Sequence, residues 1–171
     1  MKLFPAFSLL LAALAAGCAT GPETPRGPDV YVMRHLQKAD GPDPALSEEG
    51  QRNAAGLVSR FCKTRLRAIY VSTTRRARET AAPLVADRKL ETKKYDPSDT
   101  PALVSRVLAE RGPVLVVGHS NTVPEIVERL GGARPASLQD TDYGDIWLVS
   151  GRERRVQRSN LSDANLNCLP D

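Results

Sequence analysis

The chain has 171 residues, of which 41% are hydrophobic and 26% charged, so it is long enough to bury a core and too apolar to be disordered. Its net charge is +4, and only 5% of its residues are aromatic, which argues against a stacking platform for single-stranded nucleic acid. Basic residues are scattered except for a run at residues 152–158, which is predicted to be a solvated strand face. The composition therefore favours a small anionic ligand over a nucleic acid.

The N-terminus has the composition of an export signal. Lys2 precedes an apolar stretch that ends at Ala16 and is too short to span a bilayer as a mature helix. Residues 1–17 are predicted to be a signal peptide, and residues 18–28, rich in Pro, Gly and Thr, a tether. The letters L-A-A-G-C ending at Cys18 resemble a bacterial lipobox, which implies lipidation of Cys18 and an outer-membrane lipoprotein on the periplasmic side of the envelope. A plain signal peptidase site is the alternative.

Export changes what the remaining cysteines can do. An oxidising compartment permits a disulfide between Cys62 and Cys168, which would pin the C-terminal tail, residues 161–171, to the first helix. The alternative is a buried Cys62 and a free Cys168. Neither cysteine has a histidine beside it in sequence, so no thiol nucleophile is predicted.

Strands and helices alternate through the predicted domain, residues 29–160. In chain order we expect a strand at 30–34, a helix capped by Ser47, a strand at 68–71, a helix at 75–87, a helix capped by Thr100, a strand at 114–117, a helix opened by a capping box at 122–125, and a hairpin of residues 146–149 and 154–158. The stretch 90–96 is ambiguous between strand and loop. This alternation predicts an α/β fold with three layers, α/β/α, and a largely parallel sheet.

Polar and basic side chains follow the predicted strands at their ends. The chain's two histidines, His35 and His119, each come directly after a strand, and Arg34 stands next to the first of them. Three arginines at positions 75, 76 and 78 open the helix after the second strand. Because the carboxyl ends of parallel strands meet at one edge of a sheet, these groups should converge there, beside helix N-termini that favour anions. Such a site suits a phosphoryl group.

Other chemistries lack their motifs. Neither histidine has a second histidine or a carboxylate at metal-ligand spacing, and there is no glycine-rich phosphate loop. The segment from Gly118 to Ser120 lacks the second glycine of a serine-hydrolase elbow. We therefore expect neither a metal nor a cofactor.

Four motifs in order resemble the histidine phosphatase superfamily, which has the phosphoglycerate mutase-like fold. They are Arg34-His35, the letters L-S-E-E-G at 46–50, S-T-T-R-R-A-R-E-T at 72–80, and Gly118-His119. The resemblance covers residues 29–149, nearly the whole predicted domain. It implies a phosphatase that acts on a small phosphorylated substrate as a monomer.

The resemblance also implies roles for single residues. His35 would be the nucleophile and form a phosphohistidine, Arg34 and Arg76 would hold the phosphate, and His119 would stabilise charge in the transition state. The opening Arg34-His35-Leu36-Gln37-Lys38 looks like the R-H-x-x-K variant of small bacterial members. Lys38 is therefore predicted to contact phosphate or substrate, with a solvated loop lysine as the alternative.

The group that protonates the leaving oxygen is not evident in the sequence. Members of the family use a carboxylate for this step. The carboxylates in the corresponding part of the chain are Asp87, Glu91, Asp96, Asp99 and Glu125, and the capping box already explains the last of them. Without a strong acid, the chain would suit good leaving groups such as phosphoramidates or acyl phosphates. A second hypothesis is a non-catalytic envelope lipoprotein that binds phosphorylated or anionic ligands.

Overall fold

The structure is a computed structural model in which residues 27–163 are described. The predicted signal peptide, the lipidation site Cys18 and the tail cysteine Cys168 lie outside the described residues. Cys62 is disulfide-bonded, and the pairing with Cys168 stays a prediction. Within residues 27–163, no helix has the length and apolar character that crossing a bilayer requires.

The centre of the fold is a six-stranded sheet in the order β3-β2-β4-β1-β5-β6. Its strands are β1 (Val30–Arg34), β2 (Ala68–Ser72), β3 (Thr92–Tyr95), β4 (Val114–Gly118), β5 (Asp145–Ser150) and β6 (Arg155–Asn160). The first four run parallel, and β5 pairs antiparallel with both β1 and β6. The strand β3 resolves the ambiguous stretch, and the closing hairpin is confirmed.

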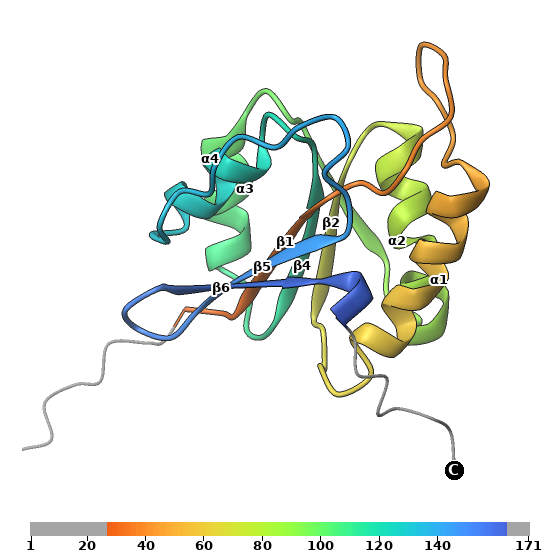
Figure 1. Ribbon diagram of the computed structural model, residues 1–171. Coiled ribbons are helices and arrows are strands. Elements are labelled where there is room, and N and C mark those ends of the chain that lie inside the picture. The colour runs from red at the N-terminus through yellow and green to blue at the C-terminus, as the bar shows by residue number, and fades with distance from the viewer. Residues whose placement is uncertain (1–26, 164–171) are drawn as a thin grey trace, which may run out of the picture.

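Helices cover both faces of this sheet (Figure 1). They are α1 (Glu48–Arg60), α2 (Arg75–Arg88), α3 (Thr100–Leu108) and α4 (Val123–Arg129). Along β4, Val114 and Val116 pack with α3 and α4, whereas Leu115 and Val117 pack with α1 and α2. The strand is therefore buried on both faces, as its unbroken apolar run predicts. The predicted three-layer α/β/α fold with a largely parallel sheet is confirmed.

The start of α1 forms as the sequence predicts. The side chain of Ser47 accepts a hydrogen bond from the Gly50 backbone N–H, and Glu48 and Glu49 occupy the first turn, where the helix dipole favours acids. Gly50 packs directly against the backbone carbonyl of Gln37, where a Cβ atom would collide. The close approach fixes α1 against the loop that follows β1.

Two predicted helix caps are wrong. Asp99, not Thr100, caps α3 by accepting from the Ala102 N–H, and Thr100 is the buried first residue of the helix. Thr122 makes no side-chain cap on α4, because its hydroxyl accepts from the His119 backbone N–H at 3.0 Å. The last residue of that predicted box, Glu125, pairs with an arginine one turn further on. The hydroxyl of Thr122 thus orders the turn that carries His119.

The predicted C-terminal tail begins with ordered structure. A 3-10 helix, η1 (Leu161–Asp163), follows β6 directly and contacts α1. This packing closes one side of the space between α1 and the β5–β6 hairpin.

Candidate active site

The two histidines lie side by side because β1 and β4 are neighbouring parallel strands. Arg34 pairs with Gly118 in the register, and the His35 N–H donates to the Gly118 carbonyl at 2.9 Å. The rings of His35 and His119 are 5.3 Å apart between centroids, and both side chains are buried. As predicted, the two imidazoles lie together at one edge of the sheet.

The ring of His35 is held in one orientation. Its Nδ1 lies 2.9 Å from the Leu36 carbonyl, which can only accept, so Nδ1 carries the hydrogen and Nε2 is left with a lone pair. The Nε–H of Arg76 donates to this Nε2 at 3.0 Å. Burial, opposed by the Leu36 hydrogen bond and reinforced by the charge of Arg76, lowers the pKa of His35 from 6.5 to about 3. The imidazole is therefore neutral at neutral pH.

The second ring, His119, is held from two sides. Its Nε2 lies 2.8 Å from the Ser72 hydroxyl, and its Nδ1 lies 3.5 Å from a terminal nitrogen of Arg76. Burial first, then the charges of Arg76 and Arg34, lower the pKa of His119 to about 4. The Ser72 hydroxyl can donate or accept, so it suits either tautomer of His119.

Arg34 is a buried cation with few anionic partners. Its Nη1 donates to the backbone carbonyls of Gln139, Asp140 and Asp142 at 2.7, 3.3 and 3.2 Å. Its Nε is buried and has no hydrogen-bond partner within residues 27–163. The carboxylate near it, that of Asp140, is fully exposed and 3.9 Å away. Arg34 therefore keeps an unused donor and an incompletely compensated charge.

Arg76 lies between the two histidines, as the motif predicts, and its neighbours in sequence point elsewhere. Arg75 pairs with Glu79 at 2.6 Å, and Arg78 donates to the backbone carbonyl of Thr73. The structure thus brings Arg34, His35, Arg76 and His119 together. Their catalytic roles stay predictions.

Lys38 is not part of this group. Its backbone forms an isolated bridge with Leu46, its side chain is exposed, and it makes no side-chain hydrogen bond or ion pair in the described part of the chain. The contact of Lys38 with phosphate or substrate stays a prediction.

Within residues 27–163, the five carboxylates predicted as candidates for the leaving-group acid form no hydrogen bond or ion pair with the four site residues. Asp87 pairs with Arg88, Asp96 binds Ser98, Asp99 caps α3, Glu125 pairs with Arg129, and Glu91 is exposed. Two other acids approach the site arginines: Asp140 beside Arg34, and Asp43, whose Oδ1 lies 3.7 Å from Arg76 Nη1. Asp43 belongs to the loop before α1, where the sequence offered only turn residues.

Tyr143 also contacts the candidate site, and the sequence analysis assigned it no role. The guanidinium of Arg34 lies 4.2 Å from the centre of the Tyr143 ring and donates to its hydroxyl at 3.4 Å. The same ring is 6.1 Å from that of His35. No motif or period marks this tyrosine. The nearby Trp147 is buried in the core.

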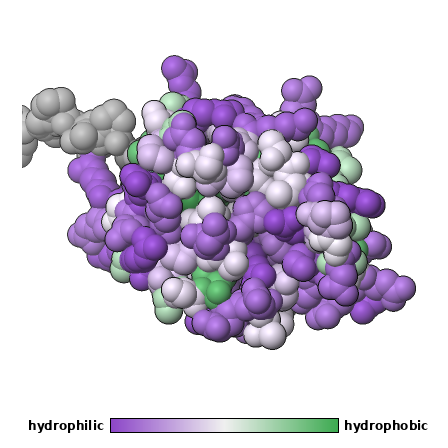
Figure 2. All heavy atoms as spheres, turned by 90° about the horizontal axis from the view of Figure 1, so that it is seen from above, coloured by the Kyte–Doolittle hydropathy of each residue, from purple (hydrophilic) through white to green (hydrophobic). Residues whose placement is uncertain are grey.

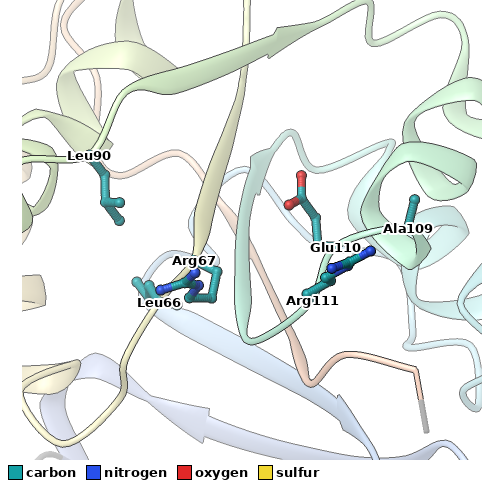
Figure 3. A pocket seen from close by; sticks show the side chains of 6 residues that line it. All are labelled: Leu66, Arg67, Leu90, Ala109, Glu110 and Arg111. Carbon is teal, nitrogen blue, oxygen red and sulfur yellow. The ribbon is translucent and has the colours of Figure 1, made fainter. Parts of the chain in front are cut away.

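The residues 27–163 contain no cluster of three potential metal ligands. A pocket near the amino ends of β2 and β4, lined by Arg67, Glu110 and Arg111 among others, contains none of the predicted site residues (Figure 3). The view from above, onto the carboxyl ends of the parallel strands, shows a largely hydrophilic face with scattered apolar residues (Figure 2). This face suits a polar ligand.

Comparisons with known proteins agree with this geometry. Residues 30–97 match the family model of the histidine phosphatase superfamily (branch 1). A mycobacterial glucosyl-3-phosphoglycerate phosphatase in complex with VO3 superposes with a TM-score of 0.59 at 17% identity, covering 78% of this chain and 98% of that one. The protein histidine phosphatase SixA in complex with tungstate superposes with a TM-score of 0.54 at 21% identity, covering 79% and 98%. A search of curated proteins by sequence gave no match. The chain therefore has the fold of these phosphatases, and its residues 30–97 match the sequence model of the histidine phosphatase superfamily.

Proposed function

We propose that this protein is a phosphatase that hydrolyses phosphate monoesters or related phosphoryl compounds through a phosphohistidine on His35, without a metal. One observation carries the proposal. A buried, neutral imidazole presents the lone pair of its Nε2 to Arg76 at 3.0 Å, in a site that also holds the buried cation Arg34. A neutral nucleophile among cations suits attack on an anionic phosphorus centre.

Binding would use donors that the free protein leaves available. The unused Nε–H of Arg34 is one, and the terminal nitrogens of Arg76 are others. Asp43 now lies near Arg76, and a phosphoryl group, with more negative charge, would displace it as the partner of that guanidinium. The substrate would then compensate both arginine charges.

The chemistry would proceed in two displacements. His35 Nε2 forms a bond to phosphorus while the bond from phosphorus to the leaving oxygen or nitrogen breaks. Water then forms a P–O bond while the N–P bond breaks, which releases inorganic phosphate. His119 would donate to the phosphoryl oxygens as charge develops, with Ser72 adjusting to the tautomer this requires. Because no described carboxylate contacts either histidine, the site suits leaving groups that depart without a strong acid.

Trapping of the covalent intermediate tests this function. Wild type incubated with a generic aryl phosphate should show turnover and, on acid-free quenching, a phosphoryl label on His35. His35→Ala should lose both, whereas His119→Gln should keep the label site and lose roughly a hundredfold in rate. If wild type showed no turnover and no label that depends on His35, the phosphatase proposal would be wrong.

The second candidate is a binding protein with the same fold, in the exported, lipid-anchored form that the N-terminal sequence predicts. The absence of a carboxylate on either histidine within residues 27–163 favours it. Calorimetric binding of inorganic phosphate to a wild type that has no turnover would support this candidate. Arg34→Gln should abolish that binding.

A further inference from the structure

A second pocket lies next to the site, beyond Tyr143. It has a volume of about 470 Å³ and is bounded by α1, the segment just before β5, the end of β6 and η1. Tyr143 and Gln37 both line it. The Tyr143 ring also contacts Arg34 and lies 6.1 Å from His35, so a single side chain borders the site and the pocket. Tyr143 therefore forms the boundary between the candidate site and this pocket.

A glycine in the middle of α1 leaves space in this pocket. Gly56 lines it, and a Cβ atom added at this position would meet nothing within 4 Å. Its backbone angle is not in the region that requires glycine. Gly50 on the same helix differs, because its contact with the Gln37 carbonyl leaves no room for a Cβ. Glycine weakens a helix relative to alanine. Neither helix stability nor packing against a neighbour calls for glycine at position 56. An open pocket does, because glycine leaves the space beside the helix free.

The pocket wall offers hydrogen bonds without net charge. The Gln37 amide donates to Glu49 at 3.0 Å and accepts from Asn53 at 3.0 Å, which fixes the orientation of these side chains. The charges of Glu49 and Arg52 on the wall offset one another. The hydroxyl of Ser162 and the face of Tyr143 complete a mixed polar and aromatic surface. Among residues 27–163, the one cation that lines the pocket is Arg52, which is largely exposed, and the apolar side chain on its wall is that of Leu161, so neither a second phosphate nor a long aliphatic chain would be well matched.

We infer that this pocket binds the uncharged, hydroxyl-bearing part of the substrate, a polyol or sugar-like group, while its phosphoryl group lies at His35. The inference rests on the proposed function, since it names the substrate class for that site. Hydroxyl groups match fixed amide and carboxylate partners, and a tyrosine ring packs against the C–H faces of such a group.

Filling the pocket tests the inference. Gly56→Leu places a side chain in the open space, and Ala55→Leu is the matched control, since Ala55 is exposed and points about 100° away on the same helix. Glucose 6-phosphate and methyl phosphate serve as probes with and without a hydroxylated group. We expect the ratio of kcat/KM for glucose 6-phosphate to that for methyl phosphate to fall about tenfold or more in Gly56→Leu and to stay at the wild-type value in Ala55→Leu.

The outcomes separate this inference from the proposed function. An unchanged ratio in Gly56→Leu, with a melting temperature no lower than that of wild type, would overturn the pocket's role and leave the phosphatase proposal standing. If wild type turned over neither probe, the phosphatase proposal would fail, and calorimetry with glucose 6-phosphate would still decide on the pocket. Weaker binding in Gly56→Leu than in Ala55→Leu would then support it, and equal binding would overturn it.

Discussion

At the scale of single residues, the candidate site has a neutral imidazole ring in contact with one cation, Arg76, and a second buried cation, Arg34, next to it in sequence. The sequence places His35 beside Arg34, and an ordinary pKa of about 6.5 would leave such a histidine partly charged near neutral pH. The structure instead buries the ring and brings Arg76 onto its Nε2, which lowers the pKa to about 3. A phosphate would thus meet a nucleophile that needs no deprotonation at neutral pH.

NMR titration of the free protein tests this charge state. The imidazole C–H signals of His35 and His119 should stay constant between about pH 5 and 8, because their pKa values of about 3 and 4 lie below this range. The two histidines are the only ones in the chain, so His119→Gln assigns the signals directly. A midpoint near 6.5 for His35 would contradict the buried, cation-flanked geometry.

At the scale of elements, α2 and the loop before β5 hold the site from opposite sides. The family motif selects Arg76 from three nearby arginines, and the structure agrees because Arg75 and Arg78 bind elsewhere. The segment 139–142, which clamps Arg34, carries no such signal. It acts through backbone carbonyls, which every residue possesses, so a sequence pattern cannot reveal it.

Helix α2 also orders the chain after His35 through Thr80, one turn beyond Arg76. The buried Thr80 hydroxyl accepts from the Leu36 N–H at 3.0 Å and donates to the Arg76 carbonyl at 2.8 Å. Thr80→Val keeps the shape but leaves the Leu36 N–H unsatisfied, which should cost about 1–3 kcal/mol in the free energy of unfolding. We also expect a lower kcat/KM, since the Leu36 carbonyl orients His35.

Urea unfolding and steady-state kinetics of Thr80→Val measure these effects. Thr73→Val, at an exposed position just before the same helix, is the control and should change neither. Wild-type stability in Thr80→Val would show that the hydroxyl is not needed to anchor this loop.

At the scale of the whole molecule, the alternation of strands and helices was enough to predict three layers and the meeting of both histidines at one edge. The strands were readable because burial on both faces leaves unbroken apolar runs such as that of β4. The cap of α3 could not be predicted, because Asp99 and Thr100 are both good caps in sequence, and only tertiary packing, which buries the threonine, decides between them. The contact of Tyr143 with Arg34 could not be predicted, because it depends on how β5 pairs with β1.

Burial of two neutral histidines links the folded state to pH. In the unfolded chain both take up a proton below about pH 6.5, whereas the folded pKa values are about 3 for His35 and about 4 for His119. The unfolded state therefore binds more protons as the pH falls, so the stability present above pH 6.5 is lost progressively toward the folded pKa values. At about pH 5.5 the loss should be about 1 kcal/mol per histidine.

Urea unfolding at about pH 7.5 and 5.5 measures this loss in a range where most carboxylates stay ionised. The double variant His35→Gln/His119→Gln is the comparison, because it removes the two groups that take up protons in the unfolded chain. Wild type should lose more stability over this interval than the variant does, whatever their difference at the higher pH. Equal losses in wild type and variant would mean that the histidines have the same pKa values in the folded protein as in the unfolded chain, and the low pKa values on which the proposed role of His35 rests would then be wrong as well.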